Sequence, residues 1–157
     1  MKPRIYTDTS VIGGYLDKEF KEWSVPLVES FQSGSRIIVL SNITILELDR
    51  APSKVKSVLE KIPESHRESV ILTDEAKSLA KNYIQAGVIS AKKSADAQHI
   101  ALATIHRVDV LVSWNFKDIV NLNQIRGYNA INLRLGYPLL EIRTPREVIG
   151  DERGKKL

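Results

Sequence analysis

The sequence predicts an α/β protein built on a parallel, doubly wound β-sheet. Short runs of β-branched and apolar residues, such as residues 4–7 and 36–40, recur along the chain and are separated by segments with helical periodicity. These runs are continuously apolar, as is typical of strands that are covered on both faces. Because helix-length segments connect consecutive strands, right-handed crossovers and hence parallel strands are expected.

The N-terminal half predicts a β-α-β unit followed by two short helices. Residues 18–34, between the first two strands, place their large apolar side chains at helical spacing and end at Gly34. Ser41 is suited to cap a helix over residues 42–51. Pro52 ends that helix, and a second helical segment follows over residues 54–62.

The C-terminal half continues the alternation of helices and strands. Thr73 and Ser94 are suited to cap two helices, and the first of these also has acidic residues in its first turn. The expected elements, in order, are an edge strand or extended segment over 69–73, helices over 74–87 and 95–107, a buried strand over 108–114, a helix over 119–136 and a last strand over 139–142.

Length and composition indicate one globular domain. The chain has 157 residues, of which 43% are hydrophobic and 27% charged, close to the average of soluble globular proteins. We expect a single domain over 1–145 and a polar C-terminal tail over 146–157. No apolar run approaches the length that spans a bilayer, so no membrane association and a cytoplasmic location are expected.

Charge and the lack of cysteine narrow the possible chemistry. The formal net charge of +4 suits a polyanionic partner such as nucleic acid without proving one. The chain has no cysteine, which excludes disulfides, thiolate nucleophiles and thiolate metal sites. Any metal must therefore be held by oxygen or imidazole, which favours hard divalent cations.

Several polar residues follow the predicted strands, where open α/β sheets bind ligands. Asp8 comes directly after the first strand, and Asn115 and Asp118 follow the strand over 108–114. Glu47 lies in an apolar segment of the helix that follows the second strand, and Asp96 lies in the first turn of its helix. All five are therefore expected along one edge of the sheet.

Each acid also has a purely structural interpretation. Glu47 is suited to a buried ion pair with Arg50, Asp96 to interaction with the helix dipole, and Asp118 to capping the next helix. Together, however, the four acids would repel one another unless a cation bridged them. Oxygen-rich sites with open water positions are typical of Mg²⁺, and Mn²⁺ accepts similar ligands. We interpret the glycines at 13 and 14 as allowing close backbone approach near that site.

Three blocks of the sequence together resemble PIN-domain ribonucleases, and most closely the VapC-type toxins of toxin–antitoxin pairs. "YTDTSVIGG" is similar to the opening strand and turn of that family, "ITILELDRA" to its second acidic block, and "SADAQHIALATIHRVDVLVSWNFKDI" to its third. The match covers nearly the whole chain in the family's order. Two departures are Asn115, where a fourth aspartate is common, and Ile119, where an aromatic residue is usual.

The resemblance implies a three-layer α/β/α sandwich with a central, mostly parallel sheet of about five strands. It also implies cleavage of single-stranded RNA by a water that Mg²⁺ or Mn²⁺ activates. The resemblance implies Asp8 and Asp96 as direct ligands, and Glu47 with Asn115 or Asp118 as residues that bind a second ion or orient the water. Supporting hydrogen bonds, or turn caps, are implied for Thr9, Ser10 and Ser113. Phosphate contacts are implied for Lys92 and Lys93, unless these are only solvated lysines.

Family partners and alternatives complete these expectations. VapC-type proteins form homodimers and bind an antitoxin, so the helical segments 18–34 and 42–62 are candidate interfaces. The alternative is that the apolar faces of these helices only form part of the protein's own core. A PIN-like module that binds RNA or protein without cutting it remains an alternative. A haloacid-dehalogenase-like phosphatase is disfavoured because it needs a second aspartate where Ser10 stands. The histidines, including His99 and His106, are interpreted as packing or surface residues.

Overall fold

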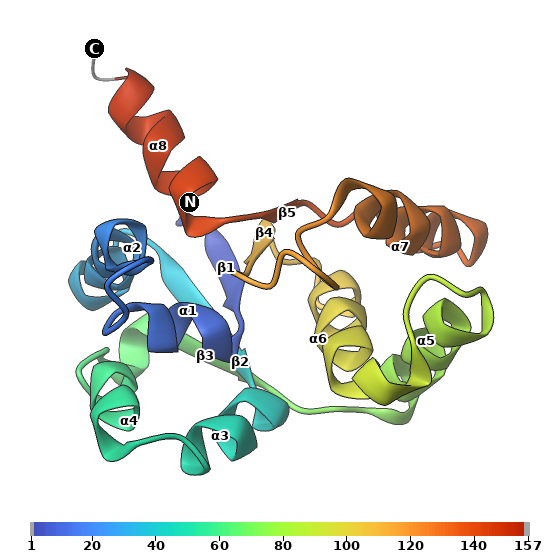
Figure 1. Ribbon diagram of the computed structural model, residues 1–157, viewed down its shortest axis with the longest axis horizontal. Helices are drawn as coiled ribbons and strands as arrows, with labels where there is room; N and C mark the ends of the chain where they lie inside the picture. Colours follow the sequence, from blue (N-terminus) through green and yellow to red (C-terminus); the bar gives the residue numbers. More distant parts are fainter. Residues whose placement is uncertain (1, 156–157) are drawn as a thin grey trace.

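The core of the protein is a five-stranded sheet in which every neighbouring pair of strands is parallel. The computed structural model describes residues 2–155, and the side chains of residues 2–150. The strand order is β3-β2-β1-β4-β5 (Figure 1), so the chain first builds outward from β1 on one side and then crosses to the other. The strands are β1 (Arg4–Thr7), β2 (Ile37–Ser41), β3 (Arg67–Val70), β4 (Val110–Val112) and β5 (Ile142–Arg143).

Helices cover both faces of this sheet. They are α1 (Thr9–Gly14), α2 (Lys21–Ser33), α3 (Asn42–Asp49), α4 (Ser53–Glu60), α5 (Asp74–Gln85), α6 (Ser94–Ile105), α7 (Leu122–Arg134) and α8 (Pro145–Lys155), with short 3-10 turns η1 (Glu64–His66) and η2 (Ala91–Lys93). In Figure 1, α5, α6 and α7 lie on one face, and α1, α2, α4 and α8 lie on the other. The predicted three-layer α/β/α class is therefore confirmed.

The two cores follow from the alternation of side chains along each strand. Tyr6 and Leu111 point into the core under α5, α6 and α7. Their strand neighbours Ile5 and Val110 point into the opposite core, which α1, α2, α4 and α8 cover. Because strands covered on both faces need apolar residues at every position, the continuous apolar runs of the sequence correspond to this central sheet.

Most predicted elements are present with shifted ends, but some predicted features of the helix starts are wrong. Ser41 and Thr73 cap α3 and α5 as expected, and Gly34 ends α2 with a φ of 83°. Ser94, by contrast, is the first residue of α6, and the N-cap residue is Lys93, which makes no side-chain capping hydrogen bond. Residues 9–14, interpreted as a turn, form helix α1, because Asp8 accepts a hydrogen bond from the Val11 amide and caps it.

The C-terminal segment 146–157 was expected to be a polar tail, but most of it is helical. The chain continues as α8, which contacts α2, and Ile149 is buried in the core beneath both helices. Val148 packs against the same core, and the Arg146 guanidinium lies over the Trp23 ring at 5.8 Å, so several contacts anchor this segment. Residues 156 and 157 lie outside the described residues. No helix in the described part of the chain combines the length and the apolar character needed to cross a membrane.

Gly14 is required by close packing, whereas Gly13 is not. A Cβ at Gly14 would lie 2.6 Å from Ser24 Oγ and 3.0 Å from Trp114 Nε1, two atoms that share a 2.8 Å hydrogen bond. A Cβ at Gly13 would meet nothing within 4 Å. The expectation of close approach is therefore correct only for Gly14, and the approaching groups are side chains.

We predict opposite effects for alanine at these two glycines. Gly14→Ala should lower the free energy of unfolding by about 1–3 kcal/mol, because the new methyl group separates Trp114 from Ser24. Gly13→Ala should leave stability unchanged or raise it by up to about 1 kcal/mol, because alanine favours the helix. Urea unfolding of both variants measures the difference, and a Gly14→Ala variant as stable as Gly13→Ala would contradict this packing.

Candidate acidic active site

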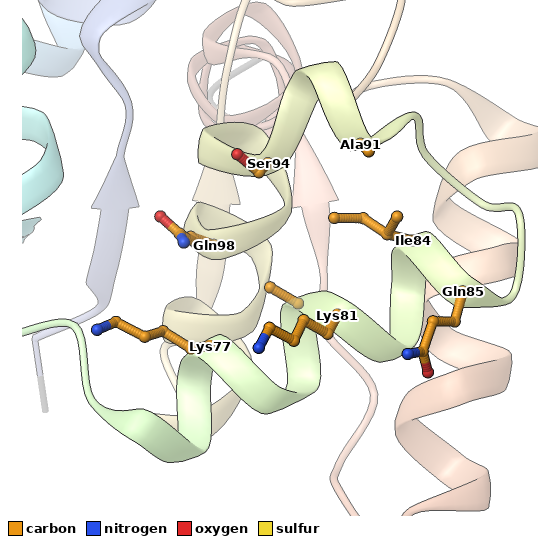
Figure 2. A pocket seen from close by; sticks show the side chains of 8 residues that line it. Lys77, Lys81, Ile84, Gln85, Ala91, Ser94 and Gln98 are labelled. Atoms are coloured by element: carbon orange, nitrogen blue, oxygen red, sulfur yellow. The ribbon is translucent and has the colours of Figure 1, made fainter.

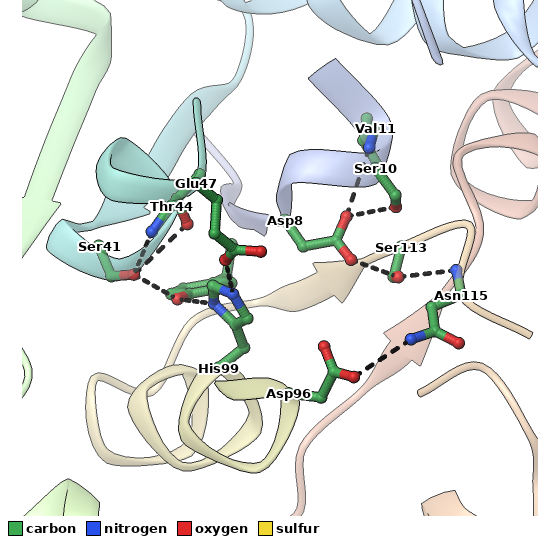
Figure 3. Close-up of polar contacts among 11 residues, drawn as sticks. Asp8, Ser10, Val11, Ser41, Thr44, Glu47, Asp96, His99, Ser113 and Asn115 are labelled. Carbon is green, nitrogen blue, oxygen red and sulfur yellow. Dashed lines mark hydrogen bonds and ion pairs between the residues drawn. The ribbon is translucent and has the colours of Figure 1, made fainter. Parts of the chain in front are cut away.

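Asp8 lies where β1 and β4 end side by side, at the point where the strand order reverses. Its Oδ2 accepts a 2.5 Å hydrogen bond from Ser113 Oγ, at the end of β4. Its Oδ1 accepts hydrogen bonds from Ser10 Oγ at 2.6 Å and from the Val11 amide at 3.3 Å. Asp8 is only 6% exposed. Ser10 and Ser113, two of the predicted supporting residues, therefore hold this buried carboxylate in one orientation (Figure 3).

Asp96, in the first turn of α6, lies across from Asp8 and is linked to the end of β4 through Asn115. The Asn115 amide nitrogen donates to Asp96 Oδ2 at 3.4 Å. The Asn115 side-chain oxygen accepts the backbone amides of Lys117 and Asp118, at 3.1 and 3.0 Å. Because that oxygen already serves two donors, Asn115 is suited to orient Asp96 and less suited to bind a cation.

Glu47 joins the site through a buried histidine. His99 Nε2 lies 2.7 Å from Glu47 Oε1, and His99 Nδ1 lies 2.7 Å from the Tyr6 hydroxyl. The hydroxyl of Tyr6 also donates to Ser41 Oγ at 2.8 Å. The chain of contacts thus runs from the end of β2 through β1 and α6 to α3 (Figure 3). Among the described residues Arg50, the alternative partner, makes no ion pair with Glu47, whose partner is His99.

Sequence reasoning missed His99 and Tyr6 as parts of the site. Tyr6 is fully buried, as its predicted strand implies, and His99, interpreted as a packing or surface residue, is 2% exposed; the polar contacts of both were not predicted. The available signal was the spacing of Asp96 and His99, which are three residues apart and therefore lie on adjacent positions of one helix face.

The other predicted residues lie around this group. Asp118 is nearly buried, and Lys93 Nζ lies 3.9 Å from its Oδ2. Asp118 does not cap α7, because Asn121 does so. The side chain of Lys92 makes no hydrogen bond or ion pair with the described residues. The hydroxyl of Thr9 is buried and lacks a hydrogen-bond partner among those residues, which leaves a polar oxygen free beside Asp8.

The electrostatics of the site disfavour negative charge on two carboxylates. Burial raises the pKa of Asp8, although hydrogen bonds from Ser10 and Ser113 act in the opposite direction. Burial also raises the pKa of Asp96; nearby His99 lowers it, and the charges of Asp8, Asp118 and Glu47 raise it further. The carboxylates are therefore close enough to repel one another and lack sufficient positive charge within the chain.

This donor set fits a hard divalent cation that keeps part of its water shell. Among the described residues, no three His, Asp or Glu side chains converge as a ready metal cage. Two carboxylates that lie across from each other (Figure 3), each with a raised pKa, are instead typical of Mg²⁺ sites with one or two carboxylate ligands. Asp8 and Asp96 are the residues that would hold it.

The raised pKa of Asp8 predicts how stability depends on pH in the absence of divalent cations. Protonated Asp8 stabilises the fold fully below the ordinary aspartate pKa, and this contribution is lost as pH rises through the higher folded pKa. Asp8→Asn resembles the protonated acid, and the hydroxyls of Ser10 and Ser113 can donate or accept. In EDTA near neutral pH, Asp8→Asn should therefore melt about 2–4 °C above the wild type.

Thermal melts of both proteins between about pH 4 and pH 7 measure this difference. The gap should shrink as pH falls, because wild-type Asp8 then becomes protonated. Glu68 acts oppositely, since Arg4 lowers its pKa, but it is common to both proteins and cancels from the difference. A wild type that melts above Asp8→Asn at neutral pH in EDTA would contradict the electrostatic description of the site.

Comparison of the whole fold with solved structures finds several that match most of this chain. A chain of VapBC2 from Rickettsia felis, solved with a DNA fragment from its promoter, superposes with a TM-score of 0.57 at 16% identity, over 90% of this chain and 98% of that one. FitAcB from Neisseria gonorrhoeae gives a TM-score of 0.57 at 18% identity, over 90% and 97% of the two chains. A toxin–antitoxin complex from Klebsiella pneumoniae gives 0.53 at 18% identity, over 73% and 88%.

These similarities concern the fold. At the level of sequence, no protein-family model matches the chain, and no curated protein matches it. The three structures are matched over most of their own length, so the predicted resemblance to VapC-type proteins is confirmed for the architecture as a whole. At this low identity the chemistry of the chain has to be argued from its own residues.

Proposed function

We propose that the protein is a divalent-cation-dependent endoribonuclease that cleaves single-stranded RNA, and that it is the toxin of a toxin–antitoxin pair. The observation that supports this most is the meeting of two carboxylates, buried Asp8 and half-buried Asp96, at the strand ends of the sheet, where the pKa of each is raised. A site that disfavours its own negative charge is suited to a cation. The fold shared with toxin–antitoxin structures supports the biological role.

In this proposal each residue acts through the contacts described above. Asp8 and Asp96 bind the cation, with Ser10, Ser113 and Asn115 holding the two carboxylates in position. A bound Mg²⁺ or Mn²⁺ supplies an activated water and offsets the charge that develops on the phosphodiester. Glu47, which His99 orients, would accept a proton from the attacking water. Asp118 is the nearest further acid and is the better candidate for a second cation than Asn115.

An antitoxin partner and a homodimer complete the proposed role, together with a location in the cytoplasm. Ile45 and Leu46 on α3 are 42% and 58% exposed, which is unusual for large apolar residues beside an acidic site. They lie within the segment 42–62 that the sequence marks as a candidate interface. An antitoxin segment that covers α3 would bury these side chains and approach Glu47 at the same time.

The test is cleavage of labelled single-stranded RNA. The purified protein should cut RNA with Mg²⁺ or Mn²⁺ and lose this activity in EDTA. Retained activity in EDTA would contradict the proposal. If no RNA is cut but RNA or a partner protein binds, the chain is instead a non-catalytic PIN-like binding module.

A further inference from the structure

A pocket of about 390 Å³ lies between α5 and α6, outside the acidic site. Its floor and one side are apolar, from Ala80, Ile84 and Ala91. Lys77 and Lys81 on α5, with Gln98 on α6, form much of its rim (Figure 2). A concave apolar surface edged by a few polar groups is typical of small-ligand sites, and this volume falls in their usual range.

Positive charge surrounds this pocket. Lys77 and Lys81 form no ion pair with any carboxylate in the described part of the chain. Lys92 and Lys93, in η2, directly precede the start of α6. Of these four lysines only Lys93 has an acidic partner, Asp118 of the acidic site, at 3.9 Å. The lysines therefore favour an anionic ligand, and Lys93 links the pocket region to the acids.

Helix α6 connects the pocket to the acidic site. Ser94 and Gln98 line the pocket, whereas Asp96 and His99, from the same turns, take part in the acidic site. A helix with its side chains is roughly 10 Å across, so the two sites lie about one helix diameter apart at the first turns of α6. Consecutive nucleotides of one extended strand can reach both.

We propose that this pocket binds one base of the single-stranded RNA substrate, next to the nucleotides that lie over the acids. This inference rests on the proposed ribonuclease function and adds a specificity site to it. The apolar floor covers the face of the base, and the amide of Gln98 hydrogen-bonds its edge. Lys77 and Lys81 contact the flanking phosphates. Single-stranded RNA offers such unpaired bases, whereas a duplex does not.

Binding of a short fluorescein-labelled single-stranded RNA in EDTA tests the lysines without cleavage. The double variant Lys77→Gln/Lys81→Gln should bind roughly 20-fold more weakly at 0.1 M salt, and the slope of log affinity against log salt should fall by about 1.4. Lys54→Gln/Lys61→Gln, on and just after α4, carries the same charge change and should bind like the wild type. Equal losses in both double variants would overturn the proposal in favour of a general charge effect.

A scan with single abasic sites along the RNA tests the base pocket itself. For the wild type, an abasic site should weaken binding about tenfold at one position, which lies at a fixed distance from the cleaved bond. A tenfold loss is the middle of the range for the affinity that one well-contacted base contributes. Ala91→Leu, which fills the pocket, and Gln98→Leu, which removes the amide, should bind more weakly and show no such position. A flat scan for the wild type would overturn the pocket assignment.

The outcomes separate this inference from the proposed function. If the wild type cleaves RNA with Mg²⁺ but its abasic scan is flat, only the pocket assignment fails. If RNA is never cleaved yet the scan has one sensitive position that Ala91→Leu abolishes, the pocket assignment holds and the nuclease proposal fails.

Discussion

Asp96→Asn is expected to reduce cation-dependent RNA cleavage by at least about 1000-fold, the equivalent of roughly 4 kcal/mol of transition-state stabilisation. Asparagine keeps the shape of the side chain but removes the negative charge that attracts the cation. Asn115 can still hydrogen-bond the remaining carbonyl oxygen. The fold should therefore survive, and the loss should appear in the rate of cleavage of a labelled RNA at saturating Mg²⁺.

A matched substitution separates this effect from a general loss of charge. Asp49, on α3 two residues after Glu47, is exposed and pairs with Lys56 at 3.2 Å. Asp49→Asn should keep the wild-type rate and lose at most about 1 kcal/mol of stability. Asp8→Asn should behave like Asp96→Asn in the rate, and both variants should gain stability in EDTA, because burial raises the pKa of both carboxyl groups. Wild-type rates in Asp96→Asn would show that this carboxylate has no part in cleavage.

His99→Phe is expected to reduce cleavage by about 10–100-fold, a typical loss when a group that orients a ligand or a catalytic carboxylate is removed. Phenylalanine fills the buried space of the imidazole but cannot hydrogen-bond Glu47 or Tyr6. Stability should fall by only about 1 kcal/mol, because Tyr6 keeps its bond to Ser41 and Glu47 is partly exposed to water.

His99→Gln provides the control for this positioning role. A glutamine amide can donate to Glu47 from a position close to Nε2, so the variant should keep a rate within a few-fold of the wild type. The affinity for Mn²⁺, measured without RNA, should follow the same order of variants if Glu47 contributes to the cation site. Equal losses in His99→Phe and His99→Gln would show that packing, and not the hydrogen bond to Glu47, matters here.

The positions of the acids at the sheet edge were predictable because they depend mainly on where the strands and helices begin and end. Once β1 and β4 are recognised as parallel neighbours, Asp8 and Asn115 must follow strands that end at the same edge. Asp96 follows from its place at the start of a helix that packs on those strands. These patterns did not fix the order of the strands, but Asp8 and Asn115 follow the ends of their strands in any parallel arrangement.

Contacts between distant segments could not be predicted in the same way. Glu47 and His99 are 52 residues apart, and only the packing of α3 near α6 brings them together. Local reasoning offered Arg50 instead, because it is three residues from Glu47. The role of Asn115 likewise depends on which of its two side-chain atoms faces Asp96, a detail set by the turn that follows β4.

Helix α1 shows the limit of local propensity. Residues 9–14 contain three β-branched residues and two glycines, which individually disfavour a helix. The helix forms because Asp8 caps it and because Val11 and Ile12 are fully buried against the core. Tertiary packing thus outweighs propensity at the point where Asp8 must be held.

The most direct test of the cation site is Mn²⁺ binding to the purified protein without RNA, measured by calorimetry or by the loss of the free-ion electron paramagnetic resonance signal. Wild-type protein and Asp49→Asn should bind Mn²⁺ and should be stabilised against heat by it. Asp8→Asn and Asp96→Asn should bind much more weakly or not at all. Wild-type protein that leaves millimolar Mn²⁺ free, or Asp8→Asn that binds it equally well, would contradict the account of Asp8 and Asp96 as cation ligands.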